Sequence, residues 1–172
     1  MTVKVGINGF GRIGRLALRE SWGAAGFEIV HINEIAGDAK SAAHLLRFDS
    51  VHGTWDKDIS ASHSNDQIIV DGQSIGYSQC ASIAETPWQA ANVDLVVECT
   101  GSLKTEQALA PYFAQGIAKI VVSAPIKGQP EETVLNVVMG VNEQKYKAQN
   151  IVTAASCTTN CLAPIAKVIN DN

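Results

Sequence analysis

The fold of this chain is decided near its start by the stretch Val3-Lys4-Val5-Gly6-Ile7-Asn8-Gly9-Phe10-Gly11-Arg12-Ile13-Gly14. Its apolar first half predicts a short β-strand, and the spaced glycines predict a tight turn directly after it. The recurrence of Ile13, Leu16 and Ala17 predicts that a helix follows. Strand, glycine turn and helix in this order are the context in which the pattern G-x-G-x-x-G indicates a dinucleotide-binding site.

The three glycines would have separate tasks. Gly9 permits the tight turn, Gly11 lets the backbone approach a pyrophosphate, and Gly14 lets the helix pack closely on the strand. Arg12 and Ile13 would offer backbone N–H groups to a phosphate at the start of the helix. On this motif alone, a glycine-rich turn without a ligand stays open as the alternative.

A carboxylate follows the second expected strand. The run 27–32 is apolar and β-branched, and Asn33 and Glu34 stand at its end. Glu34 lies about twenty residues beyond Gly14, the spacing at which a carboxylate accepts the ribose hydroxyls and repels a 2′-phosphate. This spacing favours NAD over NADP, and the alternative is a solvated carboxylate with no ligand.

Further strands and helices alternate along the chain. We expect helices over 39–48, 104–115 and 142–147, strands over 94–101, 119–125, 135–139 and 151–153, and a hairpin over 67–73. This alternation predicts an α/β protein with a doubly wound parallel (Rossmann) sheet and right-handed crossovers. Thr100 and Ser123 end two of these strands, where they either line the cofactor cleft or only form turns.

The candidate cofactor residues come from the glycine turn and from three strand ends. They are Gly9, Phe10, Gly11, Arg12, Ile13, Gly14, Asn33, Glu34, Thr100 and Ser123.

A candidate nucleophile stands near the other end of the chain, in Ala155-Ser156-Cys157-Thr158-Thr159-Asn160-Cys161. The run 151–153 has strand character, and apolar residues then recur at helical spacing, which places Cys157 in the first turn of a helix. Unpaired N–H groups and the helix dipole favour negative charge at that position. A buried, inert cysteine is the alternative, and we expect Cys161, one turn further on, to be part of the core.

A thiol of this kind needs a neighbouring base, usually histidine, for full activation. The four histidines, His31, His44, His52 and His63, all lie upstream of Cys157. We infer that the base is not among these 172 residues.

Composition excludes several classes of function. The chain has 46% hydrophobic and 17% charged residues, which is typical of a globular domain, and a net charge of −4, which provides no basic surface for nucleic acid. No apolar run is long enough to span a membrane. The four cysteines are irregularly spaced and form no zinc pattern, so we expect free thiols, no metal and a cytoplasmic location, with no signal peptide.

At this point the sequence resembles the glyceraldehyde-3-phosphate dehydrogenase family over its whole length. The matching segments are Ile7-Asn8-Gly9-Phe10-Gly11-Arg12-Ile13-Gly14-Arg15, 43–46 with 49–53, Ser123-Ala124-Pro125, Met139-Gly140-Val141-Asn142, and 155–164. The segment 155–164, which contains Cys157, is highly specific.

The resemblance implies a cytoplasmic homotetramer that oxidises glyceraldehyde 3-phosphate with NAD. In such enzymes a cysteine thiolate attacks the aldehyde, a hydride passes to NAD, and phosphate cleaves the resulting thioester. Carried over to this chain, Cys157 is the nucleophile, its N–H helps to hold the oxyanion, and Ser156 and Thr158 contact the substrate or the attacking phosphate.

Three positions depart from the family's usual pattern. Glu34 stands where aspartate is usual and is similar to erythrose-4-phosphate dehydrogenases, and Ile83-Ala84-Glu85 stands where Arg-Asp-Pro is frequent. Thr153-Ala154 replaces the usual Asn-Ala, which looks like the arsenic-resistance-associated branch, in which arsenate is thought to replace phosphate. Erythrose 4-phosphate oxidation and a non-catalytic NAD-binding fragment therefore remain the alternative functions.

Length is a fourth departure, because family members are about twice as long. The sequence predicts a dinucleotide-binding domain over 1–153 and, over 154–172, the first helix of a truncated catalytic domain whose remainder is absent. The family's catalytic histidine would lie in that remainder, so we expect this chain alone to be inactive. We also expect the sulfur of Cys157 and the bound nicotinamide to meet across one crevice.

Overall fold

The structure, a computed structural model, describes residues 2–172. Its strands are β1 (Val3–Asn8), β2 (Phe27–Asn33), β3 (Phe48–Asp49), β4 (Gly53–Thr54), β5 (Ile59–Ala61), β6 (Gln67–Val70), β7 (Gln73–Ser78), β8 (Leu95–Glu98), β9 (Lys119–Val122), β10 (Val134–Asn136) and β11 (Ile151–Thr153). Its helices are α1 (Arg12–Ser21), α2 (Ala39–Arg47), α3 (Glu106–Ala114) and α4 (Cys157–Asp171), with short 3₁₀ turns η1 (Ile83–Glu85) and η2 (Glu143–Lys145).

One twisted sheet carries most of the chain. Its strand order is β10-β11-β9-β8-β1-β2-β7-β6-β5, and every pair from β10 to β7 is parallel, while β7, β6 and β5 pair antiparallel. The chain winds outward from β1 in one direction through β2 and β7, and in the other through β8, β9 and β11. This order confirms the doubly wound Rossmann sheet and puts its switch point between β1 and β8, where such sheets bind ligands.

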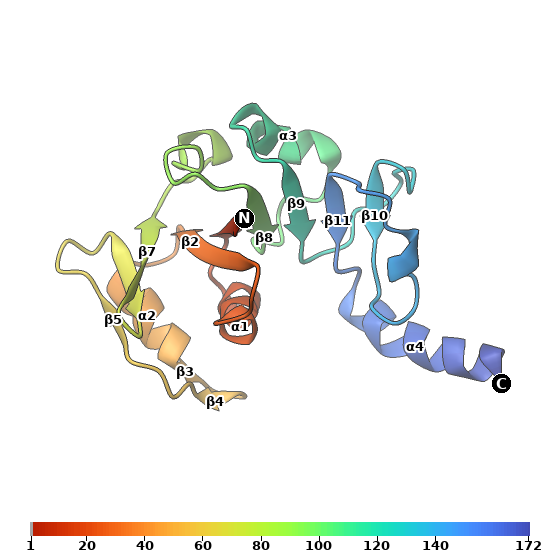
Figure 1. The fold of residues 1–172 in the computed structure, drawn as a ribbon, viewed down its shortest axis with the longest axis horizontal. Helices are drawn as coiled ribbons and strands as arrows, with labels where there is room; N and C mark the ends of the chain where they lie inside the picture. The colour runs from red at the N-terminus through yellow and green to blue at the C-terminus, as the bar shows by residue number, and fades with distance from the viewer. Residues whose placement is uncertain (1) are drawn as a thin grey trace.

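Helices cover both faces of the sheet (Figure 1). The helices α1 and α2 lie on one side, and α3 lies on the other, as expected when the two halves wind in opposite directions. The N-cap of α2 is Asp38, whose side chain accepts the Ser41 N–H at 2.8 Å, and the N-cap of α3 is Thr105, whose hydroxyl accepts the Ala108 N–H at 3.2 Å. The caps explain where these two helices start.

The core has one apolar cluster on each side of the sheet. The first lies under α1 and α2 and includes Ile7, Leu18 and Leu46, and the second lies under α3 and is centred on Trp88 and Tyr112, both fully buried. On α1, Gly14 and Leu18 are the buried positions, whereas Ile13, which the helical pattern included, is 56% exposed.

Two glycines of the first turn are required by their surroundings. Gly9 has φ +86°, and a Cβ there would lie 2.6 Å from the Thr100 backbone nitrogen at the end of β8. A Cβ on Gly14 would overlap the Gly9 carbonyl oxygen and press on Ile7 Cγ2 at 3.2 Å. Both observations support the sequence-based roles of a tight turn and of close packing between helix and strand.

Helix α4 extends away from the sheet at the C-terminal end of the chain (Figure 1). None of its residues is buried, and its apolar side chains, Leu162, Ile165, Val168 and Ile169, are each more than half exposed. Cys161 is exposed as well, so the expectation that it belongs to the core was wrong. Periodicity located the apolar face of α4 but did not show whether anything covers it.

Candidate functional site

A crevice of about 600 Å³ opens at the carboxyl ends of β1, β2 and β8, over the switch point of the sheet. Its volume lies within the usual range for small-molecule sites. Of the sequence-predicted residues, Gly9, Gly11, Asn33, Glu34 and Thr100 line it, together with Asn8, Ile35, Ala36, Cys80, Ala81, Ser82, Ile83, Ala84, Cys99, Ser102, Leu103 and Pro111.

The carboxylate of Glu34 lies between two backbone donors. One oxygen accepts the N–H of Phe10 at 2.6 Å, and the other accepts the N–H of Ala36 at 2.8 Å. Phe10 itself is 2% exposed, so it contributes its backbone to the site while its side chain packs in the core. Glu34 therefore joins the end of β2 to the glycine turn.

The first N–H groups of α1 have no capping side chain. Its N-cap is Gly11, which has no side chain to cap the first N–H groups, and no acidic residue lies in the first turn. These N–H groups belong to Arg12 and Ile13, and the positive end of the helix dipole adds to them. Neither Arg12, Ile13 nor Gly14 lines the crevice itself.

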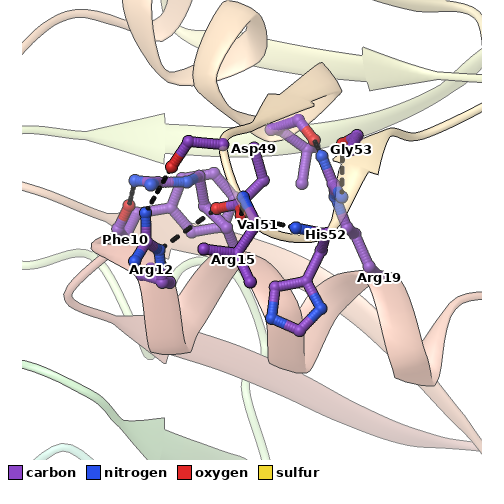
Figure 2. Close-up of polar contacts among 10 residues, drawn as sticks. Phe10, Arg12, Arg15, Arg19, Asp49, Val51, His52 and Gly53 are labelled. Carbon is purple, nitrogen blue, oxygen red and sulfur yellow. Dashed lines mark hydrogen bonds and ion pairs between the residues drawn. The ribbon is translucent and has the colours of Figure 1, made fainter.

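A loop holds the arginines along α1 (Figure 2). Asp49 accepts Arg12 Nε at 3.2 Å and also the backbone N–H groups of Val51 and His52 at 2.8 and 2.9 Å. The hydrogen bonds from His52 and Val51 lower the pKa of Asp49 to about 2, so its carboxylate is charged at neutral pH. The loop thereby fixes the guanidinium of Arg12 beside the start of the helix.

Two more arginines of α1 hold backbone carbonyls. Arg15 donates to the Phe10 carbonyl at 2.9 Å and thereby stabilises the glycine turn (Figure 2). Arg19 donates to the carbonyls of Leu46 and Gly53 (Figure 2). Burial lowers the pKa of Arg15 from its ordinary value. Sequence reasoning did not find this set, although the spacing of 12, 15 and 19 places three arginines on one helix face.

The two strand-end hydroxyls differ in position. Thr100 lines the crevice, whereas Ser123, which the sequence grouped with it, lies on the neighbouring strand end and is not among the lining residues. Cys99 lines the crevice beside Thr100, and burial raises the pKa of its thiol to about 11. The structure thus places a thiol that is protonated at neutral pH in the crevice wall, and sequence reasoning did not single it out.

The side chain of Asn33 is engaged within the protein. Its amide donates to Asn8 Oδ1 at 2.9 Å and to the Cys80 carbonyl at 3.0 Å, and its oxygen accepts from Ser78 and from the Cys80 N–H. The side chain of Asn33 is buried, at 4% exposure, and its hydrogen bonds hold β1, β2 and the segment after β7 together beneath the crevice.

Cys157 is the first residue of α4, directly after a sharp turn from β11. Ala155 in this turn has φ +55°, a left-handed conformation that is strained for a residue with a Cβ. Ser156 is the N-cap, and its hydroxyl accepts the Thr159 N–H at 3.1 Å and lies 3.1 Å from the hydroxyl of Thr158. The turn leaves Cys157 exposed at the positive end of the helix.

Two side chains that sequence reasoning did not assign hold this turn. Asn160 donates to the carbonyls of Ala154 and Ser156, at 2.7 and 2.9 Å. Thr153 accepts the Ala155 N–H at 3.0 Å through its hydroxyl. A polar asparagine one turn into a helix, just after a cysteine, was the signal available in the sequence.

The turn before α4 borders a second hollow, of about 430 Å³. Ala155, Ser156 and Thr159 line it, with 125–129 and residues near β10, whereas Cys157 lines neither this hollow nor the crevice. Within residues 2–172 no hydrogen bond reaches the sulfur of Cys157. The expectation of one shared crevice is therefore not met by these residues alone.

Comparison with known proteins gives the family. The family model for the NAD-binding domain of glyceraldehyde 3-phosphate dehydrogenase matches residues 3–106. The chain belongs to the glyceraldehyde-3-phosphate dehydrogenase family. Similar proteins include glyceraldehyde-3-phosphate dehydrogenase 3 of Nostoc sp. (50% identical over 99% of this chain) and glyceraldehyde-3-phosphate dehydrogenase 1 of Bacillus subtilis (44% over 99%). The chain spans about half the length of each of these relatives.

The family membership makes NAD the cofactor of this domain, and the crevice fits that group. Gly9 presents bare backbone where a Cβ would collide, the start of α1 has uncapped N–H groups, and Glu34 stands at the adjoining strand end. These are the features that a dinucleotide needs for its pyrophosphate and its ribose. Within residues 2–172, no helix meets the length and hydropathy of a membrane span, and His, Cys, Asp and Glu form no cluster of three suited to a metal.

Proposed function

We propose that this chain is the cofactor-binding part of a glyceraldehyde-3-phosphate dehydrogenase whose nucleophile is Cys157. The observation that carries the proposal is the placement of Cys157, exposed at the first position of α4 after a strained turn, on the same sheet as a crevice suited to NAD. The family match supports the cofactor assignment. The residues 1–153 would form the dinucleotide-binding domain, and 154–172 would begin the catalytic one.

The residues of this chain would hold NAD in the following way. Glu34 accepts hydrogen bonds from the ribose hydroxyls, the N–H groups of Arg12 and Ile13 contact the pyrophosphate, and the glycine turn and Thr100 form the wall. Phe10 and Asn33 support that wall through their hydrogen bonds to Glu34 and Asn8. Ser123, at the end of β9, stays a candidate contact of the cofactor. NAD, when bound, accepts a hydride from the substrate carbon.

The sulfur of Cys157 would carry the covalent chemistry. Its thiolate adds to the aldehyde carbon, and the oxygen that becomes negative lies near the N–H groups at the start of α4. After oxidation of that carbon a thioester remains, and an oxyanion of phosphate attacks it, so that the C–S bond breaks and the thiolate is restored. In this proposal the hydroxyls of Ser156 and Thr158, which lie 3.1 Å apart, hold the attacking anion.

The acceptor in the last step is phosphate or arsenate. The two anions are similar in shape and charge, and hydroxyl donors such as Ser156 and Thr158 would bind both. Oxidation of erythrose 4-phosphate is not favoured over glyceraldehyde 3-phosphate, since the similar proteins are named as glyceraldehyde-3-phosphate dehydrogenases. We further propose that the complete protein is a cytoplasmic homotetramer.

The proposal is tested by NAD binding and cysteine labelling of the 172-residue chain. We expect saturable binding of NAD and weaker binding of NADP, measured by calorimetry. With limiting iodoacetamide and mass spectrometry, we expect Cys157 to react faster than Cys161, which lies one turn along the same exposed helix and is the matched control. NAD binding with equal labelling of both would support a non-catalytic NAD-binding module instead.

Turnover is a separate test. Within residues 2–172 no base hydrogen-bonds Cys157, and we propose that a histidine from a catalytic half supplies it. We expect no steady-state oxidation by the 172-residue chain, and oxidation once the second half of a relative is joined to it. A rate from the 172-residue chain close to that of its full-length relatives would contradict this part of the proposal.

A further inference from the structure

A carboxylate is buried beneath the crevice, at the end of β8. Glu98 is 1% exposed, and each of its oxygens receives two hydrogen bonds. Oε1 accepts the N–H of Thr100 at 2.8 Å and its hydroxyl at 2.5 Å. Oε2 accepts Asn8 Nδ2 at 2.9 Å and the Tyr112 hydroxyl at 2.5 Å.

This carboxylate has no cationic partner among residues 2–172. Burying such a group is costly unless hydrogen bonds replace its water, and here four donors do so. An apolar residue at the end of β8 would avoid the cost of burying a charge, but it would leave the donors of Asn8, Thr100 and Tyr112 without this acceptor. The presence of Glu98 therefore calls for a role that needs two hydrogen-bond acceptors at this place.

Two of the four donors cannot change direction. The Thr100 N–H is part of the backbone, and the Asn8 amide is held because its oxygen accepts Asn33 Nδ2 at 2.9 Å. Each carboxylate oxygen of Glu98 thus faces one fixed N–H donor. A glutamine at this position would offer one acceptor and one donor. Its NH₂ group would therefore face either the Thr100 N–H or the Asn8 NH₂ group, and neither of these can accept a hydrogen bond.

Thr100 connects this buried group to the crevice. Thr100 lines the crevice. Its backbone also packs directly against Gly9, because a Cβ on Gly9 would lie only 2.6 Å from the Thr100 nitrogen. The Thr100 hydroxyl also lies 2.9 Å from that of Ser102, another lining residue. A displacement of Thr100 would move both the wall of the crevice and the support of the glycine turn.

We propose that Glu98 is a positioning residue for the cofactor, which holds Thr100 and the glycine turn in the geometry that NAD requires. The proposal rests on the crevice being the NAD site. Glu98 itself does not line the crevice, so it acts through Thr100 on one oxygen and is anchored by Asn8 and Tyr112 on the other. The site is thereby formed before NAD arrives, which lowers the cost of binding.

The test compares E98Q with Y112F, by the dissociation constant for NAD and the thermal midpoint Tm. Y112F removes a donor on the core side of the carboxylate and leaves both bonds to Thr100 in place. We expect E98Q to raise the NAD dissociation constant about tenfold, and Y112F to change it less than about twofold, although both lower Tm. A role limited to stability would make the change in binding follow the loss of Tm in both variants.

Exchanging the two groups provides a rescue. In N8D/E98Q the carboxylate stands on β1 and the amide on β8, so the hydrogen bonds to Asn33, Thr100 and Tyr112 can all be made again with the same net charge. We expect the double variant to bind NAD more tightly than E98Q. Failure of the exchange to restore any affinity contradicts the proposal.

A third variant covers the case in which E98Q does not fold. Thr100 is exposed, so T100V should fold, and it lacks the hydroxyl that Glu98 holds. We expect T100V to raise the dissociation constant severalfold with little change in Tm. An unchanged dissociation constant in T100V, with normal NAD binding by the wild type, overturns this inference alone, whereas a wild type that does not bind NAD overturns the proposed cofactor site as well.

Discussion

The carboxylate of Glu34, at the end of β2, accepts the backbone N–H of Phe10 at 2.6 Å. This bond joins the residue expected to recognise the ribose to the turn expected to hold the pyrophosphate. The second oxygen of Glu34 accepts the Ala36 N–H, so each oxygen already has one fixed donor. Because a carboxylate oxygen accepts more than one hydrogen bond, Glu34 can keep these contacts and still bind hydroxyls.

Replacing Glu34 should therefore affect both affinity and selectivity. We expect E34A to raise the dissociation constant for NAD by about tenfold or more, because both the ribose acceptor and the support of the glycine turn are lost. The preference for NAD over NADP should shrink, since the charge that repels a 2′-phosphate is gone. Calorimetric titration with both nucleotides measures this.

The control for E34A is E28A, which removes an exposed carboxylate from the same strand. E28A should leave both dissociation constants unchanged. Equal effects of the two variants would show that Glu34 acts only through the general charge of this surface.

The glycine turn allows a matched pair of variants. A Cβ on Gly14 would overlap the Gly9 carbonyl oxygen, whereas a Cβ on Gly11 would meet nothing within 4 Å, and Gly11 has φ −64°, which alanine readily adopts. We expect G14A to lower the free energy of unfolding by about 1–3 kcal/mol and G11A to change it by less than about 0.5 kcal/mol. Urea unfolding followed by tryptophan fluorescence distinguishes them.

The same pair should behave differently toward NAD. G11A, which folds normally, should still bind NAD more weakly, because its added methyl group lies where the pyrophosphate approaches. Full affinity in G11A would mean that the pyrophosphate lies elsewhere.

His31 should make stability depend on pH. Burial lowers the pKa of His31 from 6.5 to about 4, and the neutral ring packs against Trp88 and lies 2.9 Å from the Ser78 hydroxyl. Between pH 6.5 and about 4 the unfolded chain binds a proton that the folded chain does not, so stability is complete above pH 6.5 and falls as the pH is lowered toward 4. The expected loss is on the order of 3 kcal/mol.

Urea unfolding at a series of pH values checks this contribution. H31Q keeps a hydrogen-bonding side chain next to Ser78 but does not titrate, so its stability should vary less across this range than that of the wild type. H63Q, at an exposed histidine, is the matched control and should follow the wild type. A pH dependence unchanged in H31Q would assign the loss to other groups.

Asp49 should make stability depend on pH in a more acidic range than His31 does. Its pKa of about 2, against 3.8 ordinarily, means that the loop 49–53 is held above pH 4 and released as the pH falls toward 2. D49N keeps an oxygen for the N–H groups of Val51 and His52, which share Oδ1, but turns an amide toward Arg12. We expect D49N to lower Tm by a few degrees at pH 7, with the difference from the wild type vanishing near pH 2. A difference that persists at pH 2 would show that charge on Asp49 is not the cause.

Local patterns were sufficient for the elements that carry strong signals. The glycine turn, the hairpin at Asp71-Gly72, and the strands and helices of the parallel part appear where the sequence places them, within a few residues, except that the helix expected over 142–147 is only the short 3₁₀ turn η2. The short strands β3, β4 and β5 were not predicted, because two or three residues give no detectable period. Their pairing depends on partners elsewhere in the chain, such as β6 for β5.

The candidate site also has one part that the sequence predicts and one part that it does not. Gly9, Gly11, Glu34 and Thr100 are found together because strand ends of a parallel sheet meet at one edge, a rule that can be applied to a sequence. The burial of Glu98, the contacts of Asn33 and the absence of Ser123 from the lining could not be inferred, because they depend on which side chains meet after the sheet has closed.

The Rossmann fold, the family, NAD as the cofactor and the position of Cys157 at the start of a helix could all be predicted, because each depends on residues close together in the chain or on the order of elements. The exposure of α4, the position of Cys157 outside the crevice lining and the support of Thr100 by a buried carboxylate became visible in the folded chain alone. These properties arise from contacts between residues such as Asn8 and Glu98, which are 90 positions apart. No local pattern encodes such contacts, since packing brings the residues together only in the folded chain.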